Sequence, residues 1–149
     1  MSQHLILYPT FAMFALTFYV LMRMRARRFA AVRSGQVEGA YYKAYVGEEP
    51  EELRVLARHF VNLFEMPTLF YVVCLLIYVT AQANVWLVFW AWTYVVLRCI
   101  HSYIHLTTNN ILARFGVYFT SSMVLALMWA TLLVQLLMSS DPPPLGVVA

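Results

Sequence analysis

The sequence contains few charged residues and almost no cysteine. Only 11% of its 149 residues are Asp, Glu, Lys or Arg, and two are Cys. Soluble domains carry about 25% charged residues, so this composition excludes an ordinary water-soluble fold. Two cysteines are too few for a disulfide framework, and both fall within apolar runs. We therefore expect Cys74 and Cys99 to be reduced, small core residues.

Apolar residues dominate the chain instead. Hydrophobic residues make up 62% of it, and the mean hydropathy is +0.69. A membrane-spanning helix needs about 20 apolar residues, and four such runs are present, at about residues 5–22, 53–80, 85–106 and 111–138. Between and after them we expect a cytoplasmic loop at 23–52 and a short outer tail at 139–149. The sequence thus predicts one all-α membrane domain over 1–149, an antiparallel bundle of four transmembrane helices.

The positive charges lie on one side of this predicted bundle. All ten Lys and Arg residues occupy the first loop or the adjoining ends of the spans: Arg23, Arg25, Arg27, Arg28, Arg33, Lys43, Arg54, Arg58, Arg98 and Arg114. Cytoplasmic segments of membrane proteins are enriched in Lys and Arg. We therefore expect this side to face the cytoplasm, with both termini outside. No nucleic-acid partner is needed to explain the net charge of +3.

Polar residues interrupt the second predicted span on one face. Arg58, Asn62 and Glu65 have i, i+4, i+7 spacing, which places them within about 60° of one another around a helix. Arg23 ends the first span on the same side of the membrane. Ionisable residues within spans are costly and usually mark a functional site.

The third and fourth spans carry matching residues at the same depth. Arg98, His101 and His105 have i, i+3, i+7 spacing and share a face, and Arg114 and Tyr118 lie one turn apart at the start of the fourth span. All four helices therefore bring polar groups to the cytoplasmic half of the membrane. In the turn before the fourth span, Asn109 or Asn110 is a plausible N-cap.

These residues allow a structural interpretation and a functional one. Arg58 and Glu65 could form an ion pair, Arg98 could extend to the lipid headgroups, and His101 and His105 could form interhelical hydrogen bonds. Such pairs would not explain several arginines facing one carboxylate, however. The excess positive charge predicts an anionic ligand.

Two other site types are disfavoured. His101 and His105 have a spacing at which two imidazoles could share a metal, but there is no HExxH pattern and the nearby arginines would repel a cation. We therefore expect no metal. A proton or ion conductor is disfavoured because the polar groups stop at mid-membrane.

The motifs resemble those of the MAPEG family, the membrane-associated proteins in eicosanoid and glutathione metabolism. The segment Arg-His-Phe-Val-Asn-Leu-Phe-Glu-Met-Pro from Arg58 to Pro67 resembles its RxxxNxxE signature, and the run from Arg98 to His105 resembles its RxxHxxxY run. Arg114 follows Arg98 at the spacing of the activating arginine in the microsomal glutathione transferase and prostaglandin E synthase branches. The similarity covers about residues 15–135.

Two positions depart from the family pattern. His105 stands where the family has tyrosine, and Phe115 stands where prostaglandin E synthases have a serine implicated in thiol activation. The second departure argues against that isomerase activity. The loop over 29–50 has no clear counterpart in the family.

The resemblance implies a homotrimer in the lipid bilayer, with glutathione as co-substrate at a site open to the cytoplasm. A compact chain without a retention signal favours a bacterial inner membrane, and an endoplasmic-reticulum membrane is the alternative. The implied activity is that of a transferase and/or peroxidase acting on lipophilic electrophiles or lipid hydroperoxides. Arg114 would stabilise the glutathione thiolate, with Tyr118 or His105 as a second donor. The implied glutathione-binding residues are Arg23, Arg58, Asn62, Glu65, Arg98, His101 and His105. The alternative is a non-enzymatic, structural or regulatory family member that binds another anionic ligand.

Overall fold

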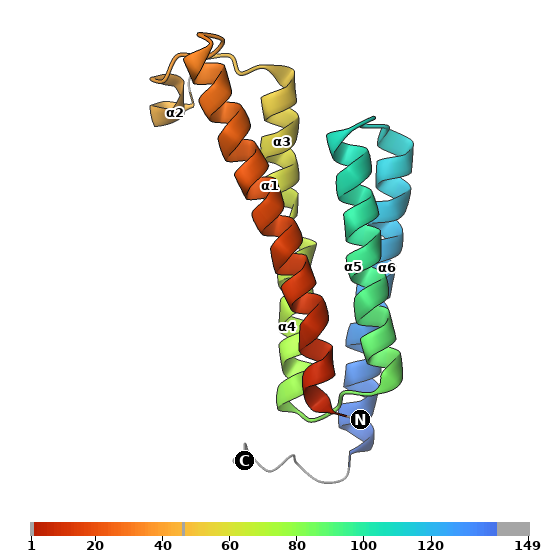
Figure 1. Cartoon of the computed structure of the whole chain (residues 1–149). Helices are drawn as coiled ribbons and strands as arrows, with labels where there is room; N and C mark the ends of the chain where they lie inside the picture. Colours follow the sequence, from red (N-terminus) through yellow and green to blue (C-terminus); the bar gives the residue numbers. More distant parts are fainter. Residues whose placement is uncertain (1, 46, 140–149) are drawn as a thin grey trace.

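The structure, a computed structural model, describes residues 2–45 and 47–139, and these residues form helices joined by short turns (Figure 1). The elements in chain order are η1 (Gln3–Leu7), α1 (Tyr8–Arg33), α2 (Tyr41–Ala44), α3 (Glu51–Asn62), α4 (Met66–Val79), α5 (Val85–Leu106) and α6 (Ile111–Met138). There is no strand among the described residues.

Four helical segments are long and apolar enough to cross a membrane. They cover Gln3–Arg33, Glu51–Val79, Val85–Leu106 and Ile111–Met138. The predicted all-α fold with four membrane-spanning helices is therefore confirmed. The segments alternate in direction, and α5 and α6 lie side by side as a hairpin (Figure 1).

One end of the bundle is fixed by two long-range hydrogen bonds. The backbone amide of Ala83 donates to Oε1 of Gln3 over 2.8 Å, and Nε2 of Gln82 donates to Oγ of Ser139 over 3.1 Å. The start of η1, the α4–α5 turn and the end of α6 therefore meet at this end. The short helix α2 lies at the opposite end (Figure 1).

The core runs along the bundle axis where α1, α4 and α5 meet. Met13 and Val20 of α1 are seven residues apart and fully buried. The rings of Phe70 in α4 and Tyr94 in α5 stack with centroids 4.5 Å apart. Cys74 of α4 is a free, buried cysteine.

The expectation that Cys99 belongs to this core is wrong. Its thiol is free, but the residue is exposed on α5. It follows Arg98, which points into the bundle, and neighbouring residues on a helix point about 100° apart. Val96, Ile100 and Tyr103, all within four residues of it on α5, are exposed as well.

Helix α1 is longer than the sequence predicted. The predicted cytoplasmic loop began at residue 23, but α1 continues to Arg33 and α2 forms within the remaining segment. Charged residues stop a helix from entering the bilayer without stopping it from being a helix. The helix ends where Gly35 adopts a φ of +75°, a conformation that glycine reaches without steric cost.

The second membrane-spanning segment is broken, whereas the sequence predicted one helix over 53–80. Helix α3 ends at Asn62, and α4 starts at Met66 with Pro67 in its first turn. Proline lacks an amide hydrogen, and its ring crowds the carbonyl four residues earlier, here that of Leu63. Glu65 lies in the break, with φ −83° and ψ −97°.

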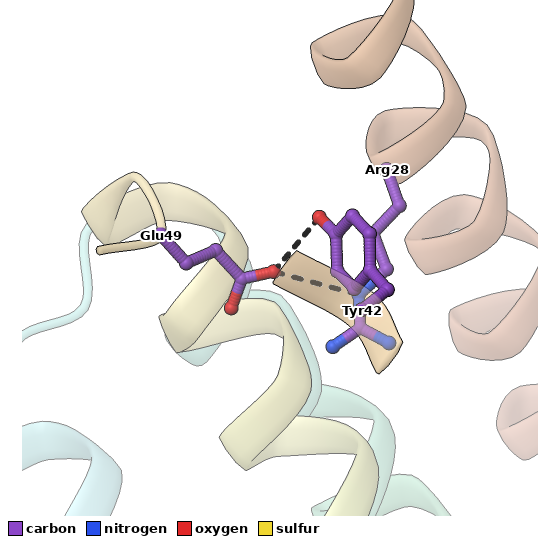
Figure 2. A network of polar contacts seen from close by, with 3 residues as sticks. All are labelled: Arg28, Tyr42 and Glu49. Atoms are coloured by element: carbon purple, nitrogen blue, oxygen red, sulfur yellow. Dashed lines mark hydrogen bonds and ion pairs between the residues drawn. The ribbon is translucent and has the colours of Figure 1, made fainter. Parts of the chain in front are cut away.

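The segment after α1 is held down by a polar network of three residues (Figure 2). The Tyr42 hydroxyl donates to Oε1 of Glu49 over 3.0 Å, and Nε of Arg28 lies 3.6 Å from the same oxygen. Burial, together with the hydrogen bond to Glu49, raises the pKa of Tyr42 to about 12. Val37 and Leu53 pack beside this network in a small second core.

We predict that Glu49→Ala loosens this segment. The change removes the acceptor for Tyr42 and the partner of Arg28, so local opening should become easier and trypsin should cleave after the exposed Lys43 about tenfold faster. Limited proteolysis of detergent-purified protein measures this rate. The exposed Glu48, changed to Ala, is the matched control and should leave it unchanged. Equal rates for both variants would contradict the prediction.

Candidate functional site

A cleft of about 950 Å³ opens between α3, α5 and α6, toward the end of the bundle that carries the basic residues. Most of its lining residues are polar, and Val61, Ile111 and Phe115 are among the apolar ones. Seven of the nine predicted site residues line it: Arg58, Asn62, Glu65, His101, His105, Arg114 and Tyr118.

The charges in the cleft are not balanced by ion pairs. Three arginines line it, Arg54, Arg58 and Arg114, beside the carboxylates of Glu51 and Glu65. Among the described residues the only ion pair within 4.0 Å joins Arg28 to Glu49, neither of which lines the cleft. The Arg58–Glu65 ion pair considered from the sequence is therefore not formed. The cleft retains a net positive charge.

Arg98 lies behind the cleft rather than on its surface. Its side chain is fully buried, at 0% exposure, which rules out the alternative in which it extends to the headgroups. Nη2 of Arg98 donates to the carbonyl oxygen of Asn62 over 3.1 Å and to Oδ1 of the same residue over 2.8 Å. In turn, Nδ2 of Asn62 donates to Oε2 of Glu65 over 3.0 Å. A chain of hydrogen bonds thus links the buried guanidinium to an exposed carboxylate.

The break in the second span makes this chain possible. Asn62 is the last residue of α3, so its carbonyl lies where Pro67 interrupts the regular helix pattern. A carbonyl in mid-helix is used by the amide four residues on, but at a helix end it needs another donor. The amide of Glu65 donates to this carbonyl over 3.4 Å, and Arg98 supplies a second, shorter hydrogen bond from the neighbouring helix.

Three histidines pack together at the cleft: His101 and His105 line it, and His59, which was not predicted as a site residue, lies behind them. The rings of His59 and His105 have centroids 4.7 Å apart, and those of His59 and His101 are 5.8 Å apart. His59 is fully buried. Helical spacing could have indicated that His59 is buried, because it lies three residues after Leu56 and four before Leu63. Both leucines are buried, and α3 contacts α5.

Arg114 is held by the turn between α5 and α6. Its Nη1 donates to Oδ1 of Asn109 over 2.6 Å and to Nε2 of His105 over 3.2 Å. Nδ1 of His101 donates to the backbone carbonyl of Arg114 over 3.2 Å. Of the two candidate N-caps, Asn110 is the one that caps α6, because its side chain accepts the amide of Ala113.

Tyr118 lies one turn further along α6 and adjoins Arg98. The guanidinium carbon of Arg98 is 5.3 Å from the Tyr118 ring centroid, and the His101 ring centroid is 5.7 Å away. Next to this polar wall, Phe115 and Phe119 stack with centroids 6.2 Å apart, and Phe115 is 65% exposed. The cleft therefore has a polar wall and an adjoining apolar one.

Arg23 does not line the cleft. It lines a second cavity, of about 370 Å³, together with Arg27 and the first turn of α3. His105 and Asn109 border both cavities. Within the described residues, no group of three or more His, Cys, Asp or Glu side chains is arranged to hold a metal ion.

Comparison with known proteins gives one match. The family model described as the MAPEG family matches residues 6–134, which include every residue of the cleft. No curated protein matches the chain, and no solved structure matches it.

We predict that Asn62→Ala destabilises the protein through Arg98. The change removes the side-chain acceptor of a buried guanidinium, and a hydrogen bond to a charged group contributes about 1.5–3 kcal/mol. The thermal midpoint of the purified protein should fall. Adding Arg98→Met should restore it, because an apolar side chain of similar size does not need the acceptor. A double variant as unstable as Asn62→Ala alone would contradict this account.

Proposed function

Because the chain belongs to the MAPEG family, we propose that it is a membrane-bound, glutathione-dependent transferase and/or peroxidase acting on lipophilic electrophiles or lipid hydroperoxides. The observation that carries the proposal is the cleft with three arginines, none paired with a carboxylate among the described residues. Such a site is incomplete without an anion.

The chemistry of glutathione fits the groups in the cleft. Glutathione has two carboxylates and one ammonium, joined by peptide groups. Arg58 is exposed in the cleft and suits a carboxylate, since a guanidinium binds one through two parallel hydrogen bonds. Glu65, oriented by Asn62, suits the ammonium. Arg98 supports this arrangement from behind through Asn62.

In the proposed mechanism, Arg114 stabilises the glutathione thiolate. A free thiol has a pKa of about 8.5, so only a small fraction is ionised at neutral pH. A guanidinium next to the sulfur favours the anion. Nε2 of His105 already accepts a hydrogen bond from Arg114, so Tyr118 is the better candidate for a second donor to the sulfur.

The apolar wall suits a lipophilic second substrate. Phe115 and Ile111 are exposed in the cleft beside Arg114, and Phe119 extends the same surface. An electrophile entering from the bilayer could contact these side chains while its reactive carbon faces the sulfur. The new sulfur–carbon bond then replaces the bond to the leaving group.

We further propose a homotrimer in a bacterial inner membrane, with both termini outside and the cleft open to the cytoplasm. The basic residues support this orientation, because they gather at the cleft end of the bundle. Arg23 would then contribute from the second cavity next to the cleft. Conjugating apolar toxic compounds, a detoxification role, would suit this location.

The second candidate is a non-enzymatic family member that binds a different anion. Phe115 favours it, because this bulky apolar side chain lies next to Arg114 and carries no group that could activate a thiol. Calorimetric titration with glutathione separates the two candidates. Heat and saturation at millimolar ligand support the enzyme, whereas their absence favours the second candidate.

We predict that the purified protein conjugates glutathione to a generic aryl halide and that Arg114→Ala lowers kcat/KM at least about 100-fold. That is the usual loss when a group stabilising developing negative charge is removed. Steady-state kinetics measure it. Arg25→Ala is the control, because Arg25 is an exposed arginine that contacts Phe29 and does not line the cleft. Full activity in Arg114→Ala would refute the assigned role.

A further inference from the structure

Arg114 uses only one of its three nitrogens for contacts within the protein. Both side-chain hydrogen bonds come from Nη1, one to Asn109 and one to His105. Nη1 carries two hydrogens, so these two acceptors occupy it fully. Nη2 and Nε make no hydrogen bond with any described residue, and the side chain lines the cleft.

The two acceptors lie where the two cavities adjoin, as do Glu51 and Val55. Asn109 and His105 border both of them, whereas Arg114 borders only the larger one. The guanidinium is therefore held through Nη1 alone, by the side chains of Asn109 and His105. A guanidinium also has no acceptor, so Nε2 of His105 must present its lone pair to Arg114.

Asn109 is suited to this position by its backbone as well as its side chain. It has a φ of +50°, in the left-handed region where asparagine is among the few residues other than glycine that are tolerated. Its amide donates to the carbonyl of Ile104 over 2.8 Å, which closes the end of α5. The same residue therefore shapes the turn and accepts the bond from Arg114.

We propose that Asn109, acting with His105, is a positioning residue that fixes the guanidinium of Arg114 so that Nη2 and Nε remain available to the glutathione sulfur. This inference rests on the proposed function. Asn109 touches neither substrate in this account; it acts through Arg114. This positioning role accounts for thiol activation by Arg114 in a chain that has Phe115, and no hydroxyl-bearing residue, next to the arginine.

Asn109→Gly is the decisive variant, because glycine keeps the left-handed backbone and removes only the side chain. The other charged or titratable groups lining the cleft stay in place: Glu51, Arg54, Arg58, Glu65, His101 and Tyr118. Asn109→Asp is the complement. It keeps an acceptor for Nη1 but adds a negative charge that opposes the thiolate. Asn110→Gly is the matched control, since Asn110 caps α6 and its side chain does not contact Arg114.

The experiment follows the ultraviolet absorbance of bound glutathione thiolate against pH, together with kcat and KM for the aryl halide reaction. We expect Asn109→Gly to lower kcat/KM about tenfold at neutral pH, the effect of losing one charge-assisted hydrogen bond, and to move thiolate formation to higher pH. We expect Asn109→Asp to shift thiolate formation in the same direction. Asn110→Gly should match the wild type in both measurements.

The outcomes separate the inference from the function on which it rests. If the wild type forms a bound thiolate and Asn109→Gly matches it in rate and pH profile, the positioning role is refuted while the function stands. A loss of rate in Asn109→Gly with an unchanged thiolate titration would also refute it, because general damage to the fold would give that result. If the wild type neither binds nor ionises glutathione, the proposed function is refuted, and this inference with it.

Discussion

A guanidinium buried at membrane depth is the constraint from which the site follows. Arg98 is fully buried, and no carboxylate lies within ion-pair distance of it among the described residues. A charge so placed is costly unless its donors find acceptors. Asn62 supplies two acceptors to Nη2, its side-chain oxygen and its backbone carbonyl, whereas Nε and Nη1 have no partner among the described residues. The carbonyl is available because Pro67 breaks the helix just beyond it. A proline, an amide and an arginine on two neighbouring membrane-spanning segments therefore act as one unit.

This unit also determines which charged side chain of the second spanning segment is presented in the cleft. Asn62 passes a hydrogen bond to Glu65, so the carboxylate is oriented on the cleft wall without being neutralised by a guanidinium. Across the cleft, Arg114 is held by the turn between α5 and α6. Each wall thus presents a charged group whose geometry is fixed by neutral partners. Amide and imidazole groups, as a donor to Glu65 and as acceptors for Arg114, orient a charge without cancelling it, which leaves the cleft attractive to an anion.

The fold and part of the site could be predicted from the sequence. Four long apolar runs specify four membrane helices because the bilayer sets their length. Helical spacing also identified seven of the fifteen residues that line the cleft. Spacing gives the face on which a residue lies, but not its depth. It could not show that Arg98 lies behind Asn62 or that Arg23 lies in a neighbouring cavity.

Three other features of the structure were not predicted from the sequence, and each has a physical reason. The sequence does not show that α1 persists through its basic residues, because charge governs membrane insertion rather than helicity. Asn109 was considered only as a cap, since its left-handed backbone conformation depends on the closure of α5. His59 was overlooked because its partners, His101 and His105, come from another helix. Each of these features depends on contacts between segments.

The central claim is that the unpaired arginines of the cleft require the carboxylates of glutathione. The most direct test compares the thermal midpoint of the purified protein with glutathione and with its diethyl ester, in which both carboxylates are blocked and the thiol is kept. A ligand that binds the folded state raises the midpoint in a saturable way. The account predicts such a rise with glutathione and none with the diester. Equal shifts with both compounds, or no shift with glutathione, would contradict it.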